Sequence, residues 1–421
     1  MLGTKVMTVR KKRLEQLLEI AQRYKGCSRK QLAATVGRDP TRLVPKTGIP
    51  KLDLVVELAG VLDWPVGEVA TFLWDDRKAR PVGEDGETGA DFETLLAQAG
   101  EAHAGGNYEH MLELGRRALA VAATSDQRAR AFNRQLGALD GLGRYTEVLQ
   151  TGKLALQESS VSPQIRRLLQ SNLANAYYSL WSLVESGAIA QSLLSFYEAN
   201  SPQTPVDQKT HAFAHYVSGH TLRRLMSVEP QQIQVLAASA ATALAKAREV
   251  YDRLATELDM PSLAGIARTC RGGLVEAEVA MGRRTATNGL DELAAGLDRV
   301  HDVTDELVGD QLESCGWWCI FACNIALRHL DDERLLQRHM AVFTNKAEEI
   351  AERLNNWSMR ERIFTMQFTR WERAVSATGI DIPCMVDNDD IRVIAGAMGR
   401  FPSFRETGWS ILRSARIVDD R

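Results

Sequence analysis

The sequence predicts an all-α protein, with a small helical domain at the N-terminus followed by a long array of helix pairs. Apolar residues recur at helical spacing through most of the chain, and no stretch has the alternating pattern of a strand. Two similar units, each with a glycine two residues before a tyrosine, begin at Gly106 and Gly143, which indicates an internal repeat. Near the N-terminus, residues 28–44 read as two short capped helices separated by a glycine turn.

This N-terminal stretch has the local signals of a helix-turn-helix. Ser28 is a suitable N-cap, because its hydroxyl can accept a hydrogen bond from a free amide of the first turn. Gly37 can adopt the left-handed conformation that ends a helix. Asp39 can cap a second short helix with Pro40 at its first position, where a missing N–H costs nothing. Helix, glycine turn and capped helix follow each other as in a helix-turn-helix.

Three more helices complete the predicted N-terminal domain, over residues 10–24, 50–64 and 66–73, and we expect residues 1–9 to form a loose arm. The residues expected inside the helix over 50–64 are Leu52, Val55, Val56, Ala59 and Leu62. The helix order and the motifs at Gln31–Gly37 and Pro50–Leu62 resemble the Cro/C1-type helix-turn-helix family over residues 9–75. We therefore predict a five-helix domain over residues 1–78.

The resemblance implies a DNA-binding surface around the second short helix. Leu43 corresponds to the core anchor of that helix, Thr41 and Arg42 to residues that face a groove, and Arg29 to a phosphate contact. The candidate DNA-binding residues are Arg29, Lys30, Arg38, Thr41, Arg42 and Lys46.

The recognition segment departs from the family pattern. The span from Gly37 to Pro50 is about three residues shorter than usual, and Pro45 lies where the recognition helix should continue. We expect a recognition helix of about one turn, or a loop in its place. Two outcomes stay open: a module that binds DNA, and a retained fold that has lost or altered its reading of DNA.

Charge separates the first residues from the rest of the chain. Residues 1–51 carry a net charge of +10 and the remaining residues −13, for a total of −3. A basic domain on an acidic body is typical of a nucleic-acid-binding module on a larger scaffold, although a solvated basic face is the alternative. The sequence has no apolar run long enough to span a membrane, no signal-peptide core at its start and only six cysteines. We expect a cytoplasmic protein with reduced thiols and no membrane partner.

A linker over residues 79–90, marked by its glycines and acidic residues, leads into the repeats. The units Gly106–Met111 with Ala118 and Leu119, and Gly143–Val148 with Ala155 and Leu156, resemble the tetratricopeptide repeat (TPR) family. A helical pattern continues beyond them without the signature residues. We predict a TPR-like α-solenoid of six or seven helix pairs over residues 91–384, with a helical cap over 385–421 built from helices at 387–398 and 405–417.

The concave face of the solenoid is the candidate binding surface for a peptide or partner protein. In peptide-binding TPR domains, polar residues on the first helix of each pair hold the backbone of an extended ligand. The repeat register places Asn133, Arg134, Asn172 and Asn175 at such positions. An amide side chain can both donate to and accept from one peptide unit. The alternative is an ordinary hydrated surface.

Residues that could carry catalysis or hold a metal do not form a recognisable motif. Cys315, Cys319 and Cys323 share one helix face and are expected to pack in the core, because three thiols from one helix do not complete a tetrahedral zinc site. His211 and His215 are spaced to bind a metal together, but no third ligand is apparent. We predict no enzyme activity, no metal and no cofactor.

The leading functional hypothesis is a transcriptional regulator. A Cro/C1-like domain followed by a TPR-like body resembles bacterial regulators in which a peptide or protein signal in the solenoid controls DNA binding. Its partners would be duplex DNA, a peptide or protein ligand, and a second copy of the chain, because two half-sites multiply affinity. The alternative hypothesis is a TPR scaffold or adaptor protein whose degenerate helix-turn-helix no longer reads DNA.

Overall fold

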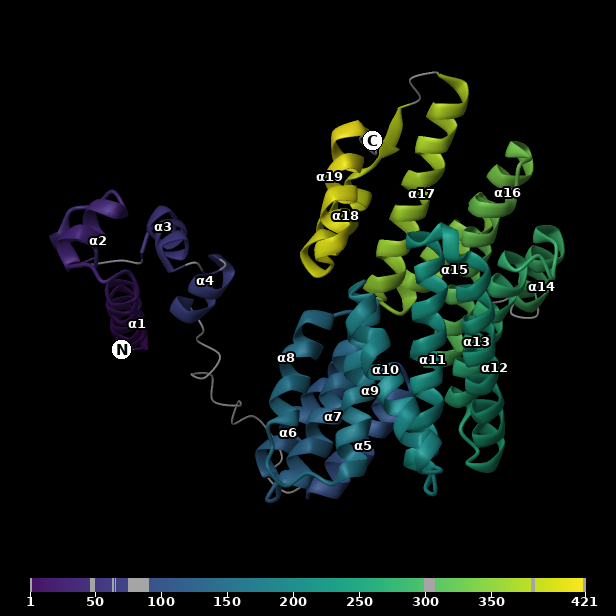
Figure 1. Cartoon of the computed structure of the whole chain (residues 1–421), viewed down its shortest axis with the longest axis horizontal. Coiled ribbons are helices and arrows are strands. Elements are labelled where there is room, and N and C mark those ends of the chain that lie inside the picture. The colour runs from purple at the N-terminus through teal and green to yellow at the C-terminus, as the bar shows by residue number, and fades with distance from the viewer. Residues whose placement is uncertain are drawn as a thin grey trace. The chain divides into compact units, whose positions relative to one another are not determined.

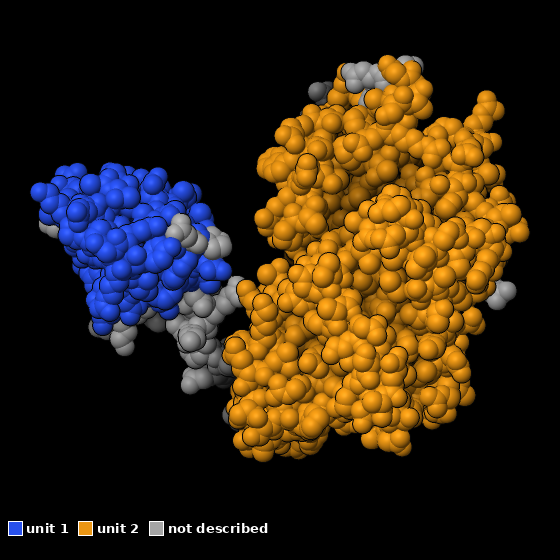
Figure 2. Space-filling model, in the orientation of Figure 1, with its two compact units in different colours: residues 1–88 blue, residues 89–421 orange. Residues whose placement is uncertain are grey.

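The computed structural model describes residues 2–45, 50–62, 64, 66–74, 91–298, 307–379 and 383–418. The chain divides into two compact units, residues 1–88 and 89–421, which are coloured separately in Figure 2. The described residues are all-α apart from two short strands near the C-terminus. No helix in the described residues is long and apolar enough to cross a membrane.

The described residues of unit 1 form four α-helices and one 3-10 turn (Figure 1). They are α1 (Leu2–Lys25), α2 (Arg29–Thr35), η1 (Pro40–Arg42), α3 (Leu52–Leu62) and α4 (Val66–Trp74). The prediction of a loose arm over residues 1–9 is wrong, because the first helix begins at Leu2. The predicted caps are confirmed. The Ser28 hydroxyl accepts from the Gln31 N–H, and Gly37 has a φ of +64°.

The predicted buried face of α3 is partly wrong. Val55, Ala59 and Leu62 are buried, but Leu52 is 69% and Val56 45% exposed. Leu54, Leu58 and Val61 are buried instead, in a core shared with Leu14, Leu17 and Leu18 of α1. The helix is apolar around most of its circumference, so its periodicity does not identify one face. Contacts with α1 and α4 decide which side turns inward.

Unit 2 begins with six helix pairs and a further long helix (Figure 1). The pairs are α5 (Phe92–Ala104) with α6 (Tyr108–Val121), α7 (Ser125–Gly141) with α8 (Tyr145–Leu156), α9 (Pro163–Ser179) with α10 (Leu183–Ala199), α11 (Pro205–Val228) with α12 (Ile233–Glu257), α13 (Pro261–Ala280) with α14 (Ala286–Asp298), and α15 (Gly309–His329) with α16 (Glu333–Arg353). A 3-10 turn, η3 (Pro230–Gln232), precedes α12, and α17 (Trp357–Thr378) follows the pairs. The first helices of successive pairs pack side by side, from α5 through α15.

The glycine and tyrosine of each repeat unit have the predicted roles. Gly106 and Gly143 have φ values of +72° and +63°, so each makes the turn between two antiparallel helices. Tyr108 and Tyr145 are buried beside these turns. The Tyr108 ring packs so closely on Gly141 that a Cβ there would lie 2.5 Å from the ring. Glycine at this position therefore allows the second pair to approach the first.

The array returns toward its own beginning, which the sequence did not predict. The first helix of the sixth pair, α15, packs against α5 of the first pair. At the contact, a Cβ on Gly106 would lie 3.3 Å from the Gly309 backbone nitrogen. The first helices of the six pairs therefore surround a common interior.

The C-terminal part is helical but includes a small sheet. It consists of β1 (Cys384–Val386), α18 (Asn388–Arg400), η4 (Pro402–Phe404), α19 (Arg405–Ser414) and β2 (Ala415–Ile417). The two strands pair in parallel, with Cys384 opposite Ala415. The helix predicted over 405–417 therefore ends early, and its last three residues are a strand. Helices α18 and α19 lie beside α17 (Figure 1), and the Phe401 ring lies 5.9 Å from the Tyr145 ring.

Candidate functional site

Three of the predicted DNA-binding cations of unit 1 are exposed and form no salt bridge among the described residues. Arg29 and Lys30 begin α2, and Thr41 and Arg42 lie on η1; all four residues are exposed. Among the described residues, no salt bridge involves Arg29, Lys30 or Arg42. Lys46, also predicted to contact DNA, lies outside the described residues.

The recognition segment is a single 3-10 turn, which confirms the expected shortening. Asp39 caps this turn by accepting a hydrogen bond from the Thr41 N–H at 2.8 Å. Hydrogen bonds with Thr41, followed by the nearby positive charge of Arg42, keep the pKa of the Asp39 carboxyl below its usual value. Leu43 is fully buried, as the family resemblance implied for the core anchor. A turn this short can bring only one or two side chains to a groove.

Arg38 differs from the other predicted DNA contacts. Its guanidinium Nη2 lies 2.5 Å from Asp53 Oδ2 on α3, and its side chain is only 22% exposed. Its charge is therefore paired within unit 1, where it ties the residues before η1 to α3.

The interior of the helix array contains a cavity of about 200 Å³. Its walls come mainly from the first helices of the six pairs, which supply at least one lining residue each. Asn172 and Asn175 of α9 line this cavity, as the repeat register predicted. Asn133 and Arg134 of α7 are half-buried and do not line it.

The predicted amides form hydrogen bonds with one another and with an acid. The Asn172 Nδ2 donates to Asn133 Oδ1 at 2.8 Å, which links α9 to α7. The Asn175 Nδ2 donates to Asp140 Oδ1 at 2.9 Å. Asn172 and Asn175 each have a carbonyl oxygen and a second N–H that form no hydrogen bond with another described residue.

Three carboxyl groups line the same cavity, and the sequence did not single them out. Asp140 comes from α7, and Asp310 and Glu313 come from the first turns of α15. Burial, followed by repulsion from Glu313, raises the pKa of Asp140 to about 7. Burial, followed by repulsion from Asp310, raises the pKa of Glu313 to about 7, and burial raises that of Asp310 to about 6. None of these three acids forms a salt bridge with a Lys or Arg among the described residues.

A register in the repeats identifies one of these acids. The residues with left-handed backbone after the first helices of the first three pairs are Gly106, Gly143 and Trp181. Three residues before each of them stand His103, Asp140 and Tyr178, and all three side chains line the cavity. Comparison of equivalent repeat positions could therefore have found Asp140. No such signal exists for Asp310 and Glu313, because their helix lacks the signature residues.

A buried ionic network lies behind the cavity wall. Glu276 of α13 is 1% exposed and accepts hydrogen bonds from Arg223 at 2.8 Å, Arg328 at 3.0 Å and Asn324 at 3.2 Å. Arg223 also donates to the Tyr178 hydroxyl at 3.1 Å. The network joins α11, α13 and α15 to α9, and it orients a tyrosine that lines the cavity.

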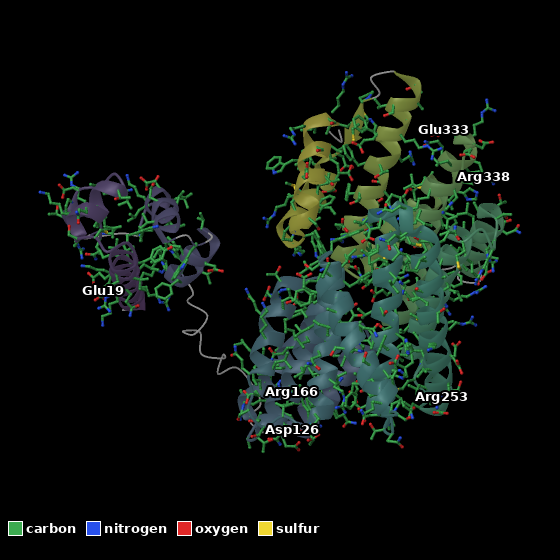
Figure 3. All side chains as sticks on the ribbon, in the orientation of Figure 1. Glu19, Asp126, Arg166, Arg253, Glu333 and Arg338 are labelled. Carbon is green, nitrogen blue, oxygen red and sulfur yellow. The ribbon has the colours of Figure 1, made fainter. Side chains whose placement is uncertain are left out.

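A second, larger cleft of about 760 Å³ lies between α16, α17 and the C-terminal elements. Its lining includes Glu333, which Figure 3 labels near the start of α16. No residue of helices α5–α15 lines this cleft, so the cleft is separate from the interior cavity.

The cysteines expected in the core are buried. Cys315, Cys319 and Cys323 are at most 1% exposed, and burial raises the pKa of Cys319 and Cys323. The rings of His211 and His215 lie 4.7 Å apart. No group of three or more His, Cys, Asp or Glu side chains in the described parts of the chain is arranged to hold a metal ion.

The chain matches no protein-family model and no curated protein sequence. Among solved structures, it is similar to the crystal structure of Bacillus thuringiensis PlcR in complex with the peptide PapR7 and DNA. The two chains are 13% identical, and the match covers 69% of this chain and 95% of that chain with a TM-score of 0.37.

Proposed function

We propose that the chain is a DNA-binding transcriptional regulator whose helix array binds a peptide or protein signal. The observation that carries the proposal is a set of exposed cations around the short turn of unit 1 that form no salt bridge among the described residues. Arg29, Lys30 and Arg42 belong to a segment with a net charge of +10, whereas the rest of the chain is acidic. A concentration of positive charge at one module favours contact with phosphates.

The cations have different roles in this proposal. Arg29 and Lys30 contact phosphates, because they lie at the start of the helix that precedes the recognition turn. Arg42 and Thr41 contact base edges, because they lie on the turn itself. Arg38 supports the turn through Asp53. Two copies of the chain bind together, because one unit with a single recognition turn offers few contacts and a second half-site multiplies the affinity.

The signal binds in the interior of the array. Asn172 and Asn175 line the cavity and can exchange hydrogen bonds with the backbone of a peptide. Asn133 supports Asn172 through their hydrogen bond, and Arg134 lies one residue further along the same helix. The ligand acts on DNA binding by favouring one arrangement of the two units, and DNA must then affect ligand binding by the same factor.

The test is capture of genomic DNA fragments by the full chain at about 50 mM and about 200 mM salt, where contacts with phosphates predict a steep loss of affinity. We expect Arg29→Ala to weaken binding to all fragments and Arg42→Ala to weaken the preferred fragments most. Arg253→Ala is the matched control, because it removes an exposed cation from α12 of unit 2 (Figure 3). Absence of capture at the lower salt concentration, with folded protein, contradicts the proposal.

The adaptor hypothesis has its own support. The recognition turn is short, and unit 1 also exposes large apolar side chains, which mark protein-binding surfaces when they form a patch. These residues are Ile20, Tyr24, Leu52, Val56, Trp64, Val66 and Phe72. Two results together favour this second function. The chain does not bind DNA, and it associates with itself or with a partner protein in a way that Leu52→Ser abolishes.

A further inference from the structure

No Lys or Arg among the described residues lines the interior cavity, and burial lowers the pKa of His103, the base in its lining that interacts with Glu313. Glu313 accepts hydrogen bonds from Trp317 at 2.9 Å and Asn356 at 3.2 Å, and both reach the same oxygen, Oε1. Asp140 accepts from Asn175, which is neutral. In the part of the chain that the structure describes, no Lys or Arg forms a salt bridge with Asp140, Asp310 or Glu313. Buried carboxylates are normally paired with a cation, so a cationic group is the missing partner.

A second feature of the cavity indicates a ligand independently of the acids. His220 is 1% exposed and lines the cavity. Its Nδ1 accepts a hydrogen bond from Arg223 Nε at 3.3 Å, so the imidazole proton is on Nε2. Nε2 has no hydrogen-bond partner among the described residues. A buried donor without an acceptor is costly, and a ligand carbonyl would satisfy it.

Helix α15 relates the two features to each other. Asp310, Glu313, Trp317 and Phe321 line the cavity along one face of this helix. The His220 ring stacks on Phe321 at 5.7 Å, so the histidine and the acids lie toward opposite ends of that face. Glu313 and Phe321 are two helical turns apart, a rise of about 12 Å.

Between these ends the wall is aromatic. Trp317 and Phe321 of α15 face the cavity together with Phe213, Tyr216 and Tyr178. Such rings accommodate apolar side chains and also attract a nearby cation.

We propose that the cavity binds the part of a peptide that carries a primary ammonium group, with the ammonium at Asp140, Asp310 and Glu313 and a backbone carbonyl at His220 Nε2. The proposal rests on the proposed function, because it specifies the signal that the array binds. The ammonium comes either from the peptide N-terminus or from a lysine side chain, and apolar side chains next to it pack on the aromatic wall. The mutual repulsion of the acids supports the proposal, since a bound cation relieves it.

The test uses the immobilised full chain and pools of random heptapeptides that are free or acetylated at the N-terminus, and that contain or lack lysine and arginine. Retained peptides are quantified by mass spectrometry. We expect retention of free-amine or lysine-containing peptides to exceed that of acetylated, lysine-free and arginine-free peptides by at least about tenfold, as for a hydrogen bond to a charged group. The double variant Asp140→Asn with Glu313→Gln should remove this preference.

The matched control is Asp126→Asn with Glu147→Gln. It removes two acids of the α7–α8 pair, to which Asp140 also belongs, and neither acid lines the cavity. Preference for free-amine pools over lysine pools identifies the N-terminus as the source of the ammonium, and the reverse identifies lysine. The ammonium site is overturned if acetylated peptides without lysine or arginine are retained as well as free-amine or lysine-containing peptides. It is also overturned if the double variant keeps the preference for free-amine or lysine-containing peptides. Either result leaves peptide binding itself intact. Retention from no pool overturns peptide binding itself, and the ammonium site with it.

Discussion

Replacement of Asp140 by asparagine should stabilise the protein, and more so at high pH than at low pH. Asp140 lines the interior cavity near Glu313 and Asp310. Asparagine has nearly the same shape, and its Oδ1 can still accept the hydrogen bond from Asn175. The substitution therefore removes the negative charge and leaves the packing and this hydrogen bond in place.

The magnitude follows from the pKa of Asp140, which burial and then Glu313 raise from the usual 3.8 to about 7. Because the folded-state pKa is raised, stability is greatest when the carboxyl is protonated and is lost as the pH increases from about 4 to about 7. At 1.36 kcal/mol per pH unit, this higher folded-state pKa lowers the free energy of unfolding by about 2 kcal/mol at pH 5, where only the unfolded carboxyl is ionised, and by about 4 kcal/mol at pH 8. Asp140→Asn should therefore increase the free energy of unfolding by these amounts.

Thermal unfolding of the full chain at pH 5 and pH 8, with and without the substitution, measures this difference. We expect Tm to increase at both pH values, with the larger increase at pH 8. Asp126→Asn is the control, because Asp126 lies at the N-terminal end of the same helix, accepts from the Ser162 N–H and does not line the cavity (Figure 3). An equal effect of Asp140→Asn at the two pH values, or a lower Tm at pH 8, refutes the assignment of a repelled carboxylate.

Two further substitutions test the packing of the array. Glu276→Gln leaves the charge of buried Arg223 without its counter-ion and should reduce the free energy of unfolding by about 3–5 kcal/mol in chemical denaturation, whereas Asp389→Asn, in an exposed pair, should produce no measurable change. Gly141→Ala places a Cβ 2.5 Å from the Tyr108 ring and should cost about 1–3 kcal/mol by overpacking; an unchanged Tm would show that the first two pairs are not packed this closely.

Much of the local structure was predictable because its determinants are close in sequence. Ser28 and Asp39 form the predicted caps, and Gly106 and Gly143 the predicted turns. The shortening of the recognition segment at Pro45 was likewise predictable, since proline restricts the backbone wherever it occurs.

Local patterns were insufficient where a helix is apolar on several sides or where a segment depends on a distant partner. Val56 was expected inside and is 45% exposed, because contacts with α1 and α4 select the buried face of α3. The end of the predicted helix over 405–417 is a strand, because residues 415–417 pair with residues 384–386. A three-residue strand has too few positions to show an alternating pattern.

The sequence by itself determined the helical class, the repeat register, and the positions of Asn172 and Asn175 on the inner helices. Only the tertiary structure decided that α15 returns to α5 and brings Asp310 and Glu313 into one cavity with Asp140. The physical reason is that each helix pair contacts mainly its neighbours, so the local pattern sets the small rotation from one pair to the next. Whether the five rotations between the six pairs bring the last pair back to the first depends on their sum, and no single stretch of sequence contains that sum.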